Sequence, residues 1–559
     1  MMKQKEFWML LLLAACLKSI GQTTFFFDGL QAVADSVDHH LYATVDRELA
    51  YITSDRDGLL EWDGDTVTQD TGIPLDYSKH VHTLRHLRDF QDTIAWKVSV
   101  TTLPLICLDF DSISEMGVSD SPATLRILSK AHPTENMQDF TTKGLARYRG
   151  GSSLSYPKKN FQVTITDSHG EENDTEVMGI RPDSKWILNA MGADLSRMRN
   201  MLCFDIWNEM SSLRDSMMLI NGIRSYYVEM LINHLYAGIY TISDKVNRKM
   251  LGLKKSTIHK KRGLLYKCVG DGGATPRMRL PIDESMYDYP NRYYEWEIKY
   301  PNFTPDDECW QPFTDLLTYT SQADTTYQYV VDHLDQYFYT NNVADYLLFI
   351  MTLMVKDNCM HNTYLSIADL ERDQRFWLTP WDLDASFGRS GWADLTDYWA
   401  NPIEVMRLTC PFYQLYTTNG NPVIGRVVEQ WKKLSKTLFH PDNIKDRIMN
   451  YAQQLQSSGA WKREVEIWQD KIITPNDHIL RLDSTAFVEA QYMIDWYERN
   501  YIHMIESMDF LSDILPTYMP GDPPLNINEA YDIEGRKVPF QSWPNMYIYQ
   551  GKKYIRRAK

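Results

Sequence analysis

Residues 356–388 constrain the fold of this chain more than any other part of the sequence. Two strand-like runs, Thr363–Ile367 and residues 375–380, are separated by a short polar segment. This pattern predicts a β-hairpin. Asp357 and Asn362 precede the first run in a D-x-x-x-x-N spacing, and an Asp-Leu-Asp tripeptide follows the second run. Carboxylate and amide side chains are therefore expected on both sides of the hairpin in the sequence.

These polar residues occur in the order of the parts of a phosphoryl-transfer site. In such a site one Asp orients the attacking hydroxyl, an Asn five residues later binds a metal ion, and a later Asp binds Mg²⁺. Mg²⁺ prefers hard oxygen ligands. The spacing predicts that Asp357 orients the hydroxyl, that Asn362 binds a metal ion, and that the pair Asp382 and Asp384 supplies the later acid; Asp384 is expected either to bind a second metal or to cap a turn. The alternative is a solvated hairpin whose acids cap turns.

A second informative stretch, residues 146–166, reads ARYRGGSSLSYPKKNFQVTIT. Gly150, Gly151 and Ser152 predict a tight loop whose backbone N–H groups could bind phosphate oxygens. An ordinary hairpin turn is the alternative reading of the two glycines.

The strand expected after this loop distinguishes its two lysines. Successive side chains of a strand point to opposite faces. Lys159 is therefore expected on the same face as Phe161 and the alternate apolar residues after it, and Lys158 on the other face. A lysine on the apolar face is costly unless it meets an anion. Lys159, rather than Lys158, is therefore predicted to bind the phosphates of ATP, with Arg147 or Arg149 as a second cation.

The N-terminus reads as an export signal. Lys3 and Lys5 precede an apolar run, residues 7–17, that is too short to anchor in a bilayer. Cleavage before Gln22 would release the protein, whereas a lipobox ending at Cys16 would attach a lipid to it. We expect the first, and no later segment is apolar enough for a transmembrane helix.

Composition excludes some functions. The net charge of −16 argues against nucleic acid as a partner. The seven cysteines are scattered without C-x-x-C pairs, which favours neither a zinc site nor a disulfide framework. Short strands with Asp-Gly turns predict a β-rich module over residues 23–98, and apolar residues at helical spacing predict helices later in the chain.

The motifs RGGSSLSYPKKNF, KWILNA, SRMRN, GIYTISDKV, EIKYP, KDNCMHNTY and LTPWDLDASFG occur in the order found in the CotH protein-kinase family, the spore-coat-protein-H type. The resemblance covers residues 103–392. It implies an α+β, atypical protein-kinase-like two-lobed fold that binds ATP and Mg²⁺ and phosphorylates Ser or Thr of proteins. Asp357 and Asp382 match the family's catalytic and metal-binding acids.

The sequence departs from the family at two of these motifs. Gly151 stands where the family usually has Asn, and Asp244 stands where it usually has Glu. If this acid orients a lysine near the nucleotide, as the corresponding Glu does in ordinary kinases, Asp244 reaches one methylene less far.

The last residues resemble the C-terminal sorting module of Bacteroidota outer-surface proteins, with the pattern YDIEGRK followed by YIYQGKKYI. This resemblance implies delivery to the cell exterior or surface, and a plain C-terminal β-hairpin is the alternative. The expected organisation is a signal peptide at 1–22, the β-rich module at 23–98, a kinase-like domain at 99–515 with its helical lobe at 393–515, and a linker with a small β module at 516–559.

The sequence thus predicts an exported, Mg²⁺-dependent protein kinase with an unidentified protein substrate. The alternative is a surface adhesion protein that keeps the fold without the activity. Binding of ATP with Mg²⁺ would distinguish the two.

Overall fold

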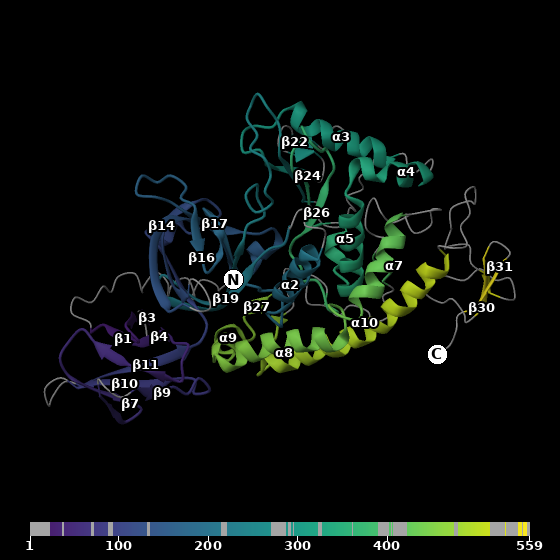
Figure 1. The fold of residues 1–559 in the computed structure, drawn as a ribbon. Helices are drawn as coiled ribbons and strands as arrows, with labels where there is room; N and C mark the ends of the chain where they lie inside the picture. The colour runs from purple at the N-terminus through teal and green to yellow at the C-terminus, as the bar shows by residue number, and fades with distance from the viewer. Residues whose placement is uncertain are drawn as a thin grey trace. The chain divides into compact units, whose positions relative to one another are not determined.

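The computed structural model describes residues 23–35, 39–68, 72–87, 93–130, 135–213, 221–269, 296–321, 327–359, 361–389, 422–473 and 479–514, with short pieces at 287–288, 292–293, 402–403, 405, 531–532, 546–549 and 552–555 (Figure 1). The signal segment with Cys16 lies outside the described residues. Within the described tail, β29 (Tyr531–Asp532), β30 (Met546–Tyr549) and β31 (Lys552–Ile555) form one antiparallel sheet. The sorting function of this tail stays a prediction.

The chain divides into two compact units. The first contains Met1–Met250, Gly391–Asp394 and Lys445–Ile494, and the second contains Leu251–Ser390, Leu395–Ile444 and Asp495–Lys559. Both helices and strands are present, which confirms the predicted α+β class. The two-lobed kinase arrangement stays a prediction.

The first unit begins with short strands that pack around an apolar core. In β10 (His82–Leu87) buried and exposed residues alternate, as expected of a strand with one face on a core. Leu84, Trp96 and Val98 lie in that core. The larger sheet has the order β3 (Val33–Asp35), β4 (His40–Thr44), β11 (Thr93–Thr101), β10, β7 (Leu59–Trp62) and β8 (Asp65–Val67); β2 (Leu30–Gln31), β1 (Phe25–Phe27) and β6 (Ile52–Ser54) form a second sheet, and β5 (Leu49–Ala50) pairs with β9 (Ile73–Pro74).

A closed β-barrel follows in the same unit. Phe161 and Trp186 lie in its core with apolar side chains from the other strands, because alternate residues of each strand face inward. A parallel pairing of the first and last strands closes it. The strand order is β12 (Leu105–Phe110), β13 (Ser121–Lys130), β14 (Met137–Arg149), β15 (Asn160–Ile165), β18 (Lys185–Asn189), β20 (Leu235–Asp244) and β19 (Ser225–Ile232).

Other elements complete this unit. Helix α9 (Ala460–Trp468) contacts the barrel strand β20, where the indole of Trp468 donates to the Ala237 carbonyl over 2.9 Å. The remaining elements are the pair β16 (Thr175–Val177) and β17 (Ile180–Asp183), helix α2 (Arg199–Ser212), and the pair β27 (Ile472–Ile473) and β28 (Ile479–Leu480).

The second unit combines a sheet with several helices. Helix α5 (Thr340–Leu353) is apolar on nearly all sides and is almost wholly buried, packed against α7 (Pro422–Leu434) and β26 (Trp377–Pro380) (Figure 1). The sheet order is β22 (Tyr287–Asp288), β23 (Arg292–Tyr293), β24 (Trp296–Tyr300), β21 (Leu264–Cys268), β25 (Thr363–Ile367) and β26. The other helices are α3 (Asp307–Ser321) and α4 (Tyr327–Tyr337), while α8 (Pro441–Ser457) and α10 (Ala486–Ile514) contribute residues to both units.

No helix among the described residues combines the length and the apolar character needed to cross a bilayer.

Candidate functional site

The predicted hairpin of the second unit is present, and its open end gathers the polar residues that flank it in the sequence. Strands β25 and β26 are antiparallel, with Thr363 opposite Pro380 as the last pair. Beyond that pair the Trp381 N–H donates to the Asn362 carbonyl over 3.0 Å. Asn362 and Asp382 are therefore brought to the same end of two adjacent strands.

Asp357 reaches this end of the hairpin from helix α5. The helix stops at Met354, which has a left-handed φ of 52°, and the one-turn 3-10 helix η5 (Lys356–Cys359) follows directly. The Asp357 carbonyl accepts a hydrogen bond from the His361 N–H at 2.6 Å. The almost wholly buried α5 thus gives the short loop that carries Asp357 a rigid support.

The two acids interact electrostatically. Burial raises the pKa of the Asp357 carboxyl above its ordinary value, and the neighbouring charge of Asp382 raises it further, while His361 acts in the opposite direction. Both carboxylates are half-buried. A pair of like charges in a partly desolvated place favours an added cation.

The backbone at two of these residues is strained. Asn362 has φ 53° and Asp382 has φ 60°, in the left-handed region that side chains other than glycine adopt at a cost of about 1–2 kcal/mol per residue. Asn and Asp tolerate this region best. Such strain is concentrated at functional sites, where it fixes the direction of a side chain.

The chemistry of these donors fits Mg²⁺. The described residues include no cluster of three or more His, Cys, Asp or Glu side chains that could hold a metal. Mg²⁺ does not require one, because it is often held by one or two carboxylates and keeps several waters. Two carboxylates and one amide, from Asp357, Asp382 and Asn362, match that requirement. Asp384 is half-buried in the same segment, and its two predicted roles stay open.

The glycine loop of the first unit joins strands β14 and β15. Gly150 has φ 132°, a backbone conformation that favours glycine, and a Cβ there would also require the Ser153 hydroxyl to move. Gly151 and Ser152 are exposed at the start of the 3-10 helix η2 (Ser152–Ser155), which has no side-chain cap. The first N–H groups of such a turn have no partner within it, and they are available to an anion.

Lys159 is half-buried beside this loop. Its Nζ donates to the Leu154 carbonyl at 2.5 Å and lies 5.9 Å from the centroid of the Tyr148 ring. Burial lowers the pKa of its ammonium. As predicted, Phe161 and the alternate apolar residues after it face the barrel core.

The expectation that Lys158 lies on the opposite, less costly face is wrong, because Lys158 is the more buried of the two lysines. Its side chain is 0% exposed and its Nζ lies 2.7 Å from Glu464 Oε1. The same carboxylate oxygen accepts from Arg197 Nε at 3.0 Å. The alternation of side chains within a strand does not apply to either lysine, because both precede Asn160, the first residue of β15.

The remaining predicted cations and the predicted orienting acid have other partners. Arg147 lies 3.2 Å from Asp120 and 3.4 Å from the Gln162 amide oxygen. Arg149 is half-buried at the end of β14. Asp244 pairs with Arg181 at 3.1 Å and accepts from the Arg224 N–H at 3.0 Å, and its role in orienting a lysine stays a prediction.

Sequence reasoning missed Glu464, the acid that pairs with Lys158. Glu464 is fully buried in α9, and its second oxygen accepts the Ile239 N–H at 2.7 Å. It lies 306 residues from Lys158 along the chain. No local pattern in the sequence links two residues so far apart.

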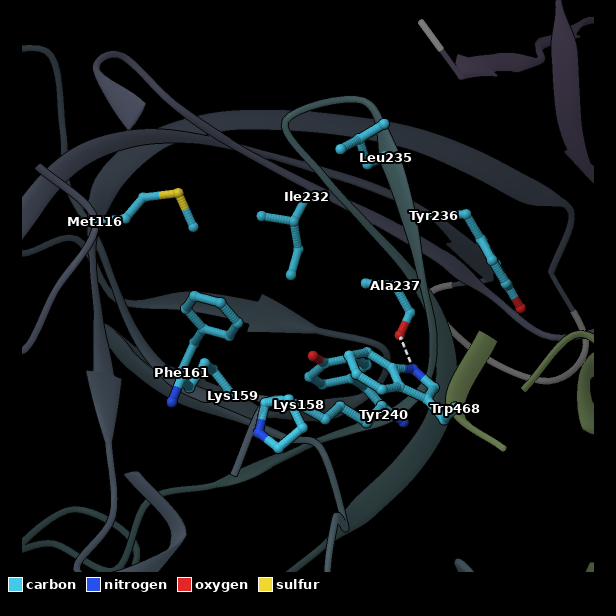
Figure 2. Close-up of a pocket in the computed structure, with 11 residues that line it drawn as sticks. Met116, Lys158, Lys159, Phe161, Ile232, Leu235, Tyr236, Ala237, Tyr240 and Trp468 are labelled. Carbon is cyan, nitrogen blue, oxygen red and sulfur yellow. Dashed lines mark hydrogen bonds between the residues drawn. The ribbon is translucent and has the colours of Figure 1, made fainter. Parts of the chain in front are cut away.

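A small cavity lies beside Lys158 (Figure 2). Figure 2 shows Lys158 with Tyr240 and Trp468, whose rings lie 4.7 Å and 5.9 Å from its Nζ. The cavity volume of about 30 Å³ is room for about two waters. A nucleotide therefore does not fit this cavity.

Comparison with known proteins supports the predicted resemblance. No match to a curated protein was found. The family model described as CotH kinase protein matches residues 146–504, so the match begins later and extends further than the motifs alone suggested. This range includes the glycine loop, the acid-bearing hairpin and Glu464. Since the match covers well over half of the chain, the protein belongs to the CotH kinase family.

Proposed function

We propose that this protein is an ATP-dependent kinase that transfers the γ-phosphate of ATP to Ser or Thr of a protein substrate and requires Mg²⁺. Membership of the CotH kinase family suggests a kinase-like function in general terms. The proposal is supported by the electrostatic interaction of Asp357 with Asp382 and by the position of Asn362 and Asp382 at the same end of the β25–β26 hairpin. Two acids and an amide in such a place can share one divalent cation.

Each of these residues has a proposed role. Asp357 accepts a hydrogen bond from the substrate hydroxyl and orients it for attack. Asp382 and Asn362 hold the metal, and Asp384 either binds a second metal or caps a turn. When bound, Mg²⁺ neutralises charge on the phosphate oxygens.

The glycine loop is proposed separately as a phosphate-binding segment. Gly150, Gly151 and Ser152 present exposed backbone at the uncapped start of η2. Lys159 lies beside that loop, and its Leu154 contact is a neutral carbonyl that an anionic phosphate can replace. Arg147 and Arg149 add positive charge to the adjoining end of β14, and Asp244 has no role in this proposal.

The proposed location is outside the cell or on its surface, because residues 1–22 have the pattern of an export signal. Cys16 remains the alternative lipid attachment site. The substrate is proposed to be a protein with an accessible Ser or Thr.

Labelling with ATP tests the proposal. Purified protein incubated with Mg²⁺ and labelled ATP is expected to label itself or casein, and Asp357→Ala or Asp382→Ala should each abolish the label. A suitable control is Asp373→Ala, because Asp373 pairs with Arg375 at 2.6 Å in the connection between the two hairpin strands and has no proposed catalytic role. Equal labelling by wild type and both site variants would contradict the proposal.

Binding measurements separate the kinase from the adhesion alternative. Calorimetry with ATP and Mg²⁺ should show heat of binding for the folded wild-type protein. A folded protein that gives no heat and no thermal shift would favour adhesion.

A further inference from the structure

The residue next to Asp357 connects the two halves of the acid site. Asn358 is 1% exposed, and its side-chain amide donates to the Trp381 carbonyl at 3.1 Å. Its Oδ1 accepts from the Trp381 N–H at 3.3 Å. A longer contact of 3.5 Å reaches the Asp382 carbonyl. One buried side chain thus joins the loop that carries Asp357 to the strand end that carries Asp382.

Helix α5 in turn fixes the backbone of Asn358. The Tyr346 hydroxyl, on this helix, donates to the Asn358 carbonyl at 2.8 Å. The same hydroxyl lies 2.6 Å from Thr363 Oγ1 at the start of β25. Tyr346 is fully buried, so these bonds are not exchanged with water. The helix, the loop and both hairpin strands therefore meet around one asparagine.

We infer that Asn358 is a positioning residue that sets the separation of Asp357 and Asp382, and that it thereby sets the affinity of the site for a divalent cation. This inference rests on the proposed function of that site. Its physical basis is that two like charges move apart unless the backbone on each side is held. Buried hydrogen bonds to the backbone beside a metal ligand fix the ligand's direction, and their loss typically weakens metal binding or activity by about 10–100-fold.

The chain contains a matched control for this residue. Asn342, on the same helix as Tyr346, is also fully buried and makes the same two-bond bridge to strand β26. Its amide donates to the Leu378 carbonyl at 3.1 Å, and its Oδ1 accepts from the Leu378 N–H at 2.7 Å. Leu378 precedes Asp382 by four residues, so loss of this bridge affects folding without releasing the metal ligand.

The test measures binding of Mn²⁺ alone, without nucleotide, by calorimetry on wild type, Asn358→Ala and Asn342→Ala. Both variants should lose comparable thermal stability, because each loses a buried two-bond bridge to the backbone of one residue, Trp381 or Leu378. Only Asn358→Ala should bind Mn²⁺ about 10-fold more weakly or worse, while Asn342→Ala should remain within about twofold of wild type.

Activity gives a second readout that a purely structural role would not change. In Asn358→Ala the Mg²⁺ concentration for half-maximal rate should rise about 10-fold, and excess Mg²⁺ should restore most of kcat. Excess Mg²⁺ should not restore activity to Asp357→Ala, which lacks the catalytic group itself.

Two results would overturn the inference in distinguishable ways. Equal Mn²⁺ affinity in folded Asn358→Ala and Asn342→Ala would reject the role of Asn358 and leave the proposed function intact. A wild-type protein that binds no Mn²⁺ would reject the proposed function as well. If Asn358→Ala does not fold, the similarly sized Asn358→Leu replaces it, because it fills the space and removes both side-chain hydrogen bonds to Trp381; unchanged Mn²⁺ affinity in that variant would also overturn the inference.

Discussion

The protein contains two clusters of charged side chains that differ in how their charge is balanced. In the first unit, Lys158 and Arg197 surround Glu464, and all three side chains are completely buried. In the second unit, Asp357 and Asp382 are half-buried near one another at the end of a hairpin. In the first cluster the carboxylate of Glu464 balances most of the positive charge, whereas the two acids of the second cluster leave an excess of negative charge.

This difference indicates a structural role for one cluster and a functional role for the other. A buried ion pair needs its partners to remain folded, because an uncompensated charge in the interior is expensive. A partly exposed pair of acids is not needed for stability and is costly in the absence of a cation. Each prediction below follows from that contrast.

The largest effect is expected for Glu464→Gln. This substitution leaves Lys158 and Arg197 in the interior without a carboxylate, and it should lower the free energy of unfolding by about 3–5 kcal/mol. Denaturant unfolding at neutral pH measures the change. A matched control is Glu466→Gln, since Glu466 is two residues away on α9, is half-exposed and pairs with His80. The control should cost less than about 1 kcal/mol, and an equal cost in both variants would contradict the contrast.

A smaller effect concerns the pH dependence contributed by Lys158. Burial lowers the pKa of the Lys158 ammonium, and the positive charge of Arg197 lowers it further. The single carboxylate of Glu464 raises it by less, so the pKa of Lys158 is about 7. Because the folded pKa lies below the unfolded value, the unfolded state binds more protons above pH 7, and stability rises with pH. Between pH 7 and pH 9 this contribution should be about 2 kcal/mol.

Replacement of the lysine tests this assignment. Lys158→Met keeps the Arg197–Glu464 pair and removes the titrating group, so its unfolding free energy should rise less between pH 7 and pH 9 than that of wild type. Parallel profiles for the two proteins would show that Lys158 keeps its proton throughout this range.

The smallest effect, and one of opposite sign, is expected for Asp382→Asn in metal-free buffer. Asparagine adopts the left-handed backbone of this position as readily as aspartate, so no strain is added. Removing one of two like charges should leave stability unchanged or raise it by up to about 1 kcal/mol at pH 7.

The repulsion between Asp357 and Asp382 also makes the stability of the metal-free protein depend on pH. Since the pKa of Asp357 is raised, the metal-free protein loses stability as pH rises from about 3.8 through the raised pKa, and Asp382→Asn should weaken that loss. Urea unfolding in a chelating buffer measures both effects. A destabilisation above about 1 kcal/mol would mean that Asp382 has a structural role.

Local patterns predicted part of this arrangement. The β25–β26 hairpin and the inward face of Phe161 followed from residue type and alternation, which act over a few positions. The same alternation failed for Lys158, because it lies before β15 and the strand geometry does not yet apply there. Alternation within a strand cannot orient a residue outside it.

Pairs between residues far apart in the chain could not be predicted from the sequence. Glu464 lies next to Lys158 because α9 packs against the barrel strand β20. Asp244, assigned to a lysine by resemblance, pairs with Arg181 from the neighbouring β17. Such partners depend on tertiary packing, and no spacing in the sequence encodes them.

The most direct test of the central claim is a calorimetric titration of the folded protein with Mg²⁺ and ATP, compared with the double variant Asp357→Asn/Asp382→Asn. The account predicts Mg²⁺-dependent ATP binding in wild type and its loss in the variant, which should remain folded. Equal binding by both proteins would contradict the claim that the metal is held at this acid site, with Asp382 as its ligand.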